Sequence, residues 1–511
     1  MTKPVIIGCS ASLRNARTGK GSVSLAEEVS GLADRDELDT YLASQASIHL
    51  DQFVKAGLGE GKPFDEVYKD LRKQGGLRGL SNTEVCLAAA FWGAKENGCD
   101  IEHVSLVDHF PANGDAVNLG ELKDALRRAD GILLATPVYF GDRSSVAQQF
   151  IEMIRSDEQL CNDLNGKVYA GVVAGAKRNG GQETTLIYQL LDMLNLGLLG
   201  VGNDSDTTSQ YGGTAHAGDV GTCPKDKYGI DTCIGTGRRI ARVSTLLHNA
   251  SRFELTASST LGLWPLQDKN GEISSKIGPM LEVCARNNDV RPLDLLNTEV
   301  RPCIACSICP IDVGPDEEYR CIIKRSSDGF MRHHGDLLEP DILLPATYSP
   351  KSRDGLKSIY QQFMERTRYL RRGDYVFSDR LVAPIIVAEV GANEHLDVRM
   401  VTSFIRHHTV MHKPIVAWVH DGKVLNADDV AKDLSNAIVW GEKLLAGRLG
   451  LTKEDDISTH YQPVGYVLAA AKDKEASTMQ ARAEAVEARR AHLLEDSEKR
   501  ISEVGQEKAS T

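Results

Sequence analysis

Short apolar runs alternate with helix-like segments along most of the chain. Five runs rich in aliphatic and β-branched residues occur in the first half, at 4–10, 100–108, 130–138, 167–176 and 198–204. Helical patterns lie between them, and a last helix is predicted to end near residue 250. This alternation is typical of a parallel sheet covered by helices. The first half is therefore predicted to form a doubly wound α/β unit.

The second half repeats this order. Its apolar runs lie at 252–259, 290–297, 340–348, 381–390 and 413–421, and a final helix is predicted at about 426–447. The similarity is closest between ILLATPVYFG and DILLPATYSP, because QQFIEMI follows the first and QQFMERT follows the second. Such a repeat indicates an internal duplication. We therefore predict an α/β fold class, with two doubly wound five-stranded parallel sheets in tandem.

Two segments fall outside this scheme. Residues 17–78 are polar and helix-forming, and they separate the first strand from its helix. A tail rich in Ala, Glu, Arg and Lys begins at about residue 472, without a sustained heptad, and is predicted to be a solvated helix or partly disordered. The predicted domains are 1–250, 251–450 and a C-terminal extension at 451–511. The 17–78 insertion is expected to pack close to the ligand site of the first domain, as a lid or an interface.

Composition narrows the class of protein. The chain has 511 residues, of which 41% are hydrophobic and 25% charged, as in ordinary globular proteins. A net charge of -12 argues against nucleic acid or an anionic membrane as a partner. No apolar stretch is long enough to span a membrane. The 11 cysteines do not resemble a disulfide framework, so a cytoplasmic location is expected.

Four cysteines in one stretch carry the strongest chemical signal. The segment CIACSICPIDVGPDEEYRC contains Cys303, Cys306, Cys309 and Cys321. Thiolates at this spacing can converge on one centre and hold an iron–sulfur cluster. The same ligands could form a structural zinc site, or they could be unrelated thiols. We interpret the segment as a cluster site, most simply one with four irons, preceded by a strand in VRPLDLLNTEVRP.

Polar and glycine-rich loops follow three of the strands in the first half. Ser10, Ser12 and Arg14 end the first strand, and Ser81, Asn82 and Thr83 precede a helix after the insertion. Together they predict a phosphate site at a helix N-terminus, although helix capping is the alternative. The loops after the third and fourth strands can approach a flat ring, and ordinary turns are the alternative. Their candidate residues are Pro137, Val138, Tyr139, Phe140, Gly141, Gly180, Gly181 and Gln182.

These motifs resemble the flavodoxin-fold NAD(P)H-dependent FMN reductases, and in particular their iron–sulfur flavoproteins. The family's GSxRxxSNT phosphate loop is matched in two pieces, its SPVYFG loop by TPVYFG, and its GGQETTL segment without change. Tyr211 stands where the family often has a further flavin-side loop, and RPCIACSIC matches the family's cysteine segment. The resemblance implies flavodoxin-like domains, bound FMN, a cluster, and NAD(P)H or ferredoxin as electron donor.

The chain also departs from this family. The first half keeps the flavin loops and the second half keeps the cysteines, whereas the family has both in one domain. The second half lacks the Arg and the SNT helix start, so it is not expected to form a good FMN site. The predicted function is electron transfer between NAD(P)H or ferredoxin, FMN and the cluster, with an unidentified acceptor. Alternatives are a small-molecule reductase with a structural cysteine loop, or a redox-sensing or assembly subunit. A homo-oligomer is expected.

Overall fold

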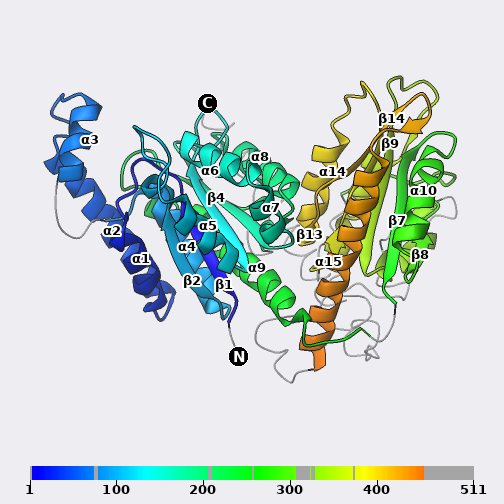
Figure 1. Cartoon of the computed structure of the whole chain (residues 1–511), viewed down its shortest axis with the longest axis horizontal. Coiled ribbons are helices and arrows are strands. Elements are labelled where there is room, and N and C mark those ends of the chain that lie inside the picture. Colours follow the sequence, from blue (N-terminus) through cyan, green and yellow to red (C-terminus); the bar gives the residue numbers. More distant parts are fainter. Residues whose placement is uncertain are drawn as a thin grey trace, which may run out of the picture.

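The computed structural model describes residues 3–73, 79–204, 210–255, 258–305, 321, 323, 328–371 and 375–453. Two of the predicted cluster ligands, Cys306 and Cys309, lie outside the described residues, and so does the predicted tail. Figure 1 shows two α/β halves side by side, joined near their last helices. Within the described residues, no helix is both long enough and apolar enough to cross a membrane.

The first half contains a parallel sheet in the order β2-β1-β3-β4-β5. Its strands are β1 (Val5–Ser10), β2 (Asp100–Ser105), β3 (Gly131–Pro137), β4 (Val168–Gly175) and a fifth strand in two pieces, β5 (Leu199–Gly200) and β6 (Gly213–His216). Both pieces pair with β4 in parallel. The side chains of β4 are buried along its whole length, which explains why it reads as a continuous apolar run.

Helices cover both faces of this sheet. One face packs against α4 (Asn82–Glu96) and α9 (Lys227–Ala250), which share a core with the apolar side chains of β1, β3 and β4. The other face packs against α5 (Leu119–Arg128), α6 (Ser145–Arg155), α7 (Glu158–Leu164) and α8 (Gln182–Asn195). This arrangement is the predicted doubly wound fold, and it is flavodoxin-like in its strand order.

The second half has the equivalent order β8-β7-β9-β12-β14, again parallel. Its strands are β7 (Thr260–Asp268), β8 (Asp289–Pro292), β9 (Ile342–Ser349), β11 (Leu381–Val382) with β12 (Ile385–Glu389), and β13 (Val410–Met411) with β14 (Ile415–His420). Two short strands, β10 (Lys357–Ser358) and β15 (Lys423–Val424), pair antiparallel at its margins. The second strand is shorter than the predicted 290–297.

The helices of the second half are α10 (Glu272–Cys284), α11 (His334–Leu338), α12 (Tyr360–Arg366), α13 (Arg368–Arg371), α14 (Leu396–Phe404) and α15 (Ala427–Lys453). The last of these continues past the predicted end at 447 and past the predicted domain boundary at 450. That the two halves arose by duplication stays a prediction, although their strand orders are the same.

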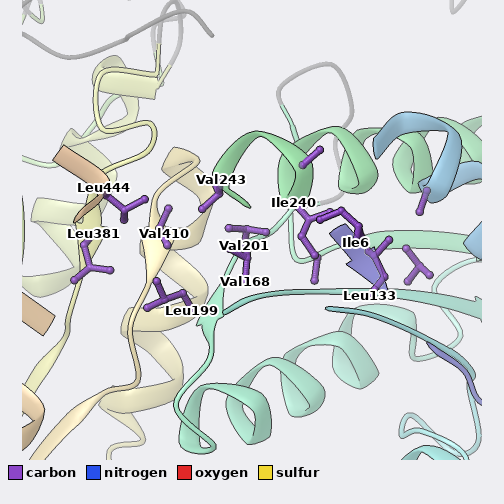
Figure 2. Close-up of a cluster of buried hydrophobic side chains, with 14 of the residues drawn as sticks. Ile6, Leu133, Val168, Leu199, Val201, Ile240, Val243, Leu381, Val410 and Leu444 are labelled. Carbon is purple, nitrogen blue, oxygen red and sulfur yellow. The ribbon is translucent and has the colours of Figure 1, made fainter. Parts of the chain in front are cut away.

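The two predicted five-stranded sheets are joined edge to edge into one, a feature that the sequence analysis did not predict. Strand β5 pairs antiparallel with β13 through Gly200 and Met411. On one face of the joined sheet, Leu199, Val201 and Val243 meet Leu381, Val410 and Leu444 in one apolar cluster (Figure 2). Helices α9 and α15 pack together beside it, and a Cβ on Gly447 would lie only 2.2 Å from the carbonyl oxygen of Leu246. Equivalent elements of the two halves therefore contact each other, as in a twofold dimer.

A buried ion pair also crosses this junction. The guanidinium of Arg239, in α9, pairs with the carboxylate of Asp379 and donates to the carbonyl of His408. Arg242 pairs with the second oxygen of Asp379 at 3.1 Å. Burial alone would raise the pKa of Asp379, but the two arginines hold that pKa below its ordinary value. The halves are thus joined by charge as well as by apolar packing.

The insertion forms three helices, α1 (Lys20–Ser30), α2 (Arg35–Lys55) and α3 (Phe64–Lys73). They lie on the side of the first half that is remote from the second half (Figure 1). Helices α1 and α2 pack on α4, which is the helix that follows the predicted phosphate loop. The insertion therefore lies beside the candidate ligand site and not at the junction of the halves.

Candidate flavin site and cysteine loop

The two pieces of the predicted phosphate loop come together in the structure. The side chain of Asn15 connects them, because its amide nitrogen donates to Ser10 Oγ at 2.7 Å and its amide oxygen accepts from Ser81 Oγ at 3.1 Å. Ser81 caps α4, as the capping alternative proposed, and Glu84 completes a capping box. Ser81 therefore caps the helix, and its predicted role in binding phosphate stays a prediction.

A buried carboxylate supports the loop from below. Glu84 is fully buried and accepts hydrogen bonds from the backbone N–H groups of Ala16, Arg17 and Ser81. Burial raises the pKa of Glu84, and these hydrogen bonds oppose that shift. Glu84 was missed as a site residue, although its position three residues after Ser81 is the signature of a capping box. It shapes the backbone around which a ligand phosphate would bind.

The six predicted phosphate-loop residues do not all face the same way. Ser10 is buried, and its Oγ lies 2.8 Å from Nε2 of His103, whereas Arg14 is exposed. The amide of Asn82 donates to the carbonyl of Asp219 at 3.0 Å, so it faces the 219–223 loop. Ser12 and Thr83 are buried, and Ser12 Oγ accepts a hydrogen bond from the backbone N–H of Arg14 at 3.2 Å. Their contacts with FMN stay predictions.

The insertion adds a residue to this loop that sequence reasoning missed. Helix α2 accepts a hydrogen bond from Leu80 N through the carbonyl of Gln45, one turn before His49. His49 is 1% exposed, and neither of its ring nitrogens has a partner among the described residues. Burial, and to a smaller extent the nearby charge of Arg14, lowers the pKa of His49 to about 4. An orphaned ring N–H beside this loop fits an anionic ligand such as the FMN phosphate.

The loops after β3 and β4 meet closely enough to form one edge of a ring site. A Cβ on Gly181, which has φ +104°, would lie 2.6 Å from Cα of Gly141. Only glycine allows this approach, so the two backbones form a cradle that a side chain would fill. Ser144 ties the same region to the first loop, since its hydroxyl donates to the carbonyl of Ala11 at 2.5 Å. This cradle fits the edge of a flavin ring.

The remaining predicted ring residues differ in exposure. Pro137 and Val138 are half-buried, whereas Tyr139 and Phe140 are exposed at the tip of the β3 loop. Gln182 is buried, and its amide bonds the N–H of Gly180 and the carbonyl of Lys177, at 2.8 and 2.7 Å. Gln182 therefore holds the loop in shape. Its predicted contact with the ring stays a prediction.

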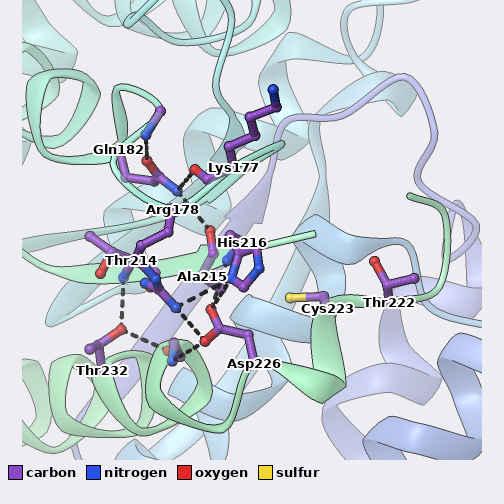
Figure 3. Close-up of polar contacts among 12 residues, drawn as sticks. Lys177, Arg178, Gln182, Thr214, Ala215, His216, Thr222, Cys223, Asp226 and Thr232 are labelled. Atoms are coloured by element: carbon purple, nitrogen blue, oxygen red, sulfur yellow. Dashed lines mark hydrogen bonds and ion pairs between the residues drawn. The ribbon is translucent and has the colours of Figure 1, made fainter. Parts of the chain in front are cut away.

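A charged network supports the β4 loop from the other side (Figure 3). Arg178 pairs with Asp226 and donates to the carbonyl of Thr214 at 3.0 Å, while His216 lies 3.1 Å from the same carboxylate. Burial would raise the pKa of Asp226, but hydrogen bonds from His216 and Gly229 and the charge of Arg178 hold it below its usual value. Sequence reasoning missed this network because its members come from three separate segments.

The two ends of the cysteine segment are held by one buried ion pair. Arg366, at the end of α12, forms two hydrogen bonds of 2.9 and 2.8 Å with the carboxylate of Asp328. The same guanidinium donates to the carbonyls of Arg301 at 3.0 Å and Ile323 at 3.3 Å. Asp328 also accepts from the backbone N–H of Arg301 at 3.2 Å. We call Arg366 and Asp328 the clamp.

The clamp places two of the predicted ligands near one anchor. Cys303 follows Arg301 by two residues, and Cys321 precedes Ile323 by two. Both thiols are half-buried, which suits metal ligands. Within the described residues no group of three metal-ligating side chains converges, and Cys306 and Cys309 are outside that part of the chain. The thiol chemistry and the shared anchor fit a cluster bound by all four cysteines.

One contact links the pocket of Cys303 to the first half across the junction. Arg406, from the second half, lies over the ring of Tyr211, with 5.6 Å between the guanidinium carbon and the ring centroid. Arg406 and Cys303 line the same pocket. Tyr211 is nearly buried and precedes β6, whose carboxyl end at His216 pairs with Gly175 before the β4 loop. A predicted flavin-side residue of the first half therefore contacts an arginine in the wall of the Cys303 pocket.

Comparison with known proteins shows which family this chain resembles. The model of the NADPH-dependent FMN reductase family matches residues 74–204. An iron–sulfur flavoprotein of Methanocaldococcus jannaschii is 32% identical over 186 residues, which cover 34% of this chain and 95% of that relative. An NAD(P)H dehydrogenase (quinone) of Caulobacter vibrioides is 27% identical over 186 residues, covering 32% of this chain and 92% of the relative.

Solved structures add little to this. A flavodoxin, WrbA-like protein from Agrobacterium tumefaciens is 16% identical, and the match covers 48% of this chain and 98% of that one, with a TM-score of 0.25. Because this score is low, the fold assignment rests on strand order and not on that match. Fold and loops define a flavodoxin-like flavoprotein. The chain belongs to the NADPH-dependent FMN reductase family, and it is an FMN-dependent oxidoreductase.

Proposed function

We propose that this oxidoreductase transfers electrons between NAD(P)H or reduced ferredoxin, FMN and an iron–sulfur cluster. The observation that carries the proposal is the contact of Arg406 with Tyr211, since Arg406 also lines the pocket of Cys303. This contact links a predicted flavin-side residue of one half to the pocket beside the cysteine loop of the other, which supports electron transfer between them. The relative from Methanocaldococcus jannaschii is named an iron–sulfur flavoprotein, which supports the pairing of a flavin with an iron–sulfur cluster.

The first half supplies the residues that would hold FMN. Ser12, Thr83 and the helix start at Ser81 would bind the phosphate, and the Gly141–Gly181 cradle would receive the ring edge. Bound FMN supplies two-electron and one-electron chemistry. The residues of the chain bind and orient the ring, and we assign no side chain to proton transfer.

The second half would hold the cluster through Cys303, Cys306, Cys309 and Cys321. A bound cluster supplies one-electron chemistry. The clamp serves this site by fixing the backbone on both sides of the cysteine segment, so that the outer two thiols start from fixed positions. With the cofactors divided in this way, each half has its own binding task.

The test replaces one cluster ligand. Cys303→Ser should remove iron while FMN and its reduction by the two-electron donor NAD(P)H persist, because serine is a poor substitute for a thiolate ligand. Reduction of a one-electron acceptor should be lost. Cys284→Ser is the matched control, since Cys284 is also half-buried and free but bonds the carbonyl of Ala431 far from the loop. Loss of FMN together with iron in folded Cys303→Ser protein would contradict the division of the two sites.

A further inference from the structure

A pocket of about 390 Å³ opens beside Cys303 in the second half. Its wall is formed by the end of α12, by α13 and by the turn after α14. A volume of this size is typical of a small-molecule site. The pocket is separate from the flavin loops, which belong to the first half, and none of the predicted FMN residues lines it.

The charge of the pocket wall is strongly positive. The described residues that line it include three arginines, Arg368, Arg371 and Arg406, and one glutamate, Glu365. Neither Arg368 nor Arg406 pairs with a carboxylate in the part of the chain that the structure describes. A positively charged pocket wall contrasts with the chain as a whole, which has a net charge of -12. Clustered guanidinium groups are the usual means of binding carboxylate and phosphate.

A buried imidazole adds a polar atom to the same wall. His407 is 3% exposed, and its Nε2 lies 3.1 Å from the hydroxyl of Thr367. Its Nδ1 is buried and has no partner among the described residues. Buried polar atoms are normally hydrogen-bonded, so an orphaned one in a pocket wall indicates a missing ligand. The thiol side of the wall is Cys303, and Arg406 extends from the pocket to Tyr211.

We propose that this pocket binds a small oxyanion, a carboxylate or phosphate, through Arg368, Arg371 and Arg406. His407 Nδ1 lies in the wall as an additional hydrogen-bonding atom for the anion. The position beside Cys303 makes the bound anion a neighbour of the cysteine site, and any role of the anion at that site rests on the proposed function. Binding itself does not, because it requires only the charge and shape of the wall.

The experiment is calorimetric titration of the full chain, purified without oxygen, with inorganic phosphate and separately with citrate at low ionic strength. At least one anion should bind with a dissociation constant below about 1 mM. Arg368→Gln and Arg406→Gln should each weaken binding about tenfold or more, because each removes a charge-assisted hydrogen bond. Arg332→Gln is the control, since Arg332 is exposed and is not part of the pocket wall. Binding of phosphate alone or of citrate alone identifies the chemical group that the pocket prefers.

No binding of either anion up to about 10 mM would overturn the proposal. Binding that is equal in wild type and both pocket variants would also overturn it. Arg406 is exposed, so its replacement is not expected to unfold the chain, and Arg368→Lys provides a second variant that keeps the charge. Iron and flavin are measured in the same samples. If the anion binds to protein that lacks iron, the proposed anion site stands and the proposed redox function fails.

Discussion

Replacing Asp328 by asparagine tests the clamp. The side chains of Arg366 and Asp328 are both completely buried. The Asp328→Asn change leaves a buried guanidinium without its counter-charge, which is expected to lower the free energy of unfolding by about 3–5 kcal/mol. The loss falls first on the backbone that the clamp fixes, at Arg301 and Ile323. Cys303 lies two residues after Arg301 and Cys321 two residues before Ile323. Both thiols should therefore lose their fixed positions, and most of the bound iron should be lost.

A matched variant separates the local effect from general destabilisation. Asp379→Asn breaks a second buried pair, in which Arg239 is 2% and Asp379 0% exposed, at the junction of the halves. It should lower the melting temperature by a similar amount and keep its iron. Iron and FMN per chain after anaerobic gel filtration, with thermal melts by circular dichroism, give the comparison. Equal iron content in the two variants would refute the role of the clamp.

Three further predictions concern the flavin loops and pH. Gly181→Val should reduce FMN content, because a Cβ there would lie 2.6 Å from Gly141 Cα, whereas Gly218→Ala should not, since no atom lies within 4 Å. Ser12→Ala with Thr83→Ala should weaken FMN retention without unfolding, each hydroxyl contributing about 1.5–3 kcal/mol, and unchanged flavin after gel filtration would contradict the loop. The free energy of unfolding should fall as pH drops from about 6.5 toward 4, because histidines of the unfolded chain then bind protons that the buried histidines of the folded chain do not. Each such histidine should lower this free energy by about 2 kcal/mol by pH 5. A melting temperature that stays constant over this pH range would contradict the prediction. The histidines with pKa lowered to about 3 or 4 by burial are His49, His103, His407 and His412.

Much of the architecture could be predicted because it depends on local pattern. Alternating apolar runs and helices indicated the doubly wound parallel sheet of each half, and the repeated QQF segments indicated that the halves correspond. The capping box from Ser81 to Glu84 could also be read locally, since its members are three residues apart. Strands repeat every two residues and α-helices every 3.6 residues, so residues that are close in the sequence are enough to reveal these elements.

The rest depends on contacts between distant segments. The clamp joins residues 38 positions apart, and the Arg239–Asp379 pair joins residues 140 positions apart. No periodic pattern marks such partners, so neither pair could be predicted. The joining of the two sheets through β5 and β13 was missed for the same reason, because an edge strand does not reveal its partner. The position of His49 beside the phosphate loop depends on how the insertion packs.

The most direct test of the central claim is cofactor analysis of the wild-type chain. Protein purified without oxygen should contain FMN in the first half and an iron–sulfur cluster in the second, with about four irons per chain and a visible spectrum of both chromophores. A Cys306→Ser variant of the same preparation should keep the FMN and lose the iron. Stoichiometric zinc with no iron in the wild-type protein, or FMN and iron lost together in a variant that remains folded, would contradict the account.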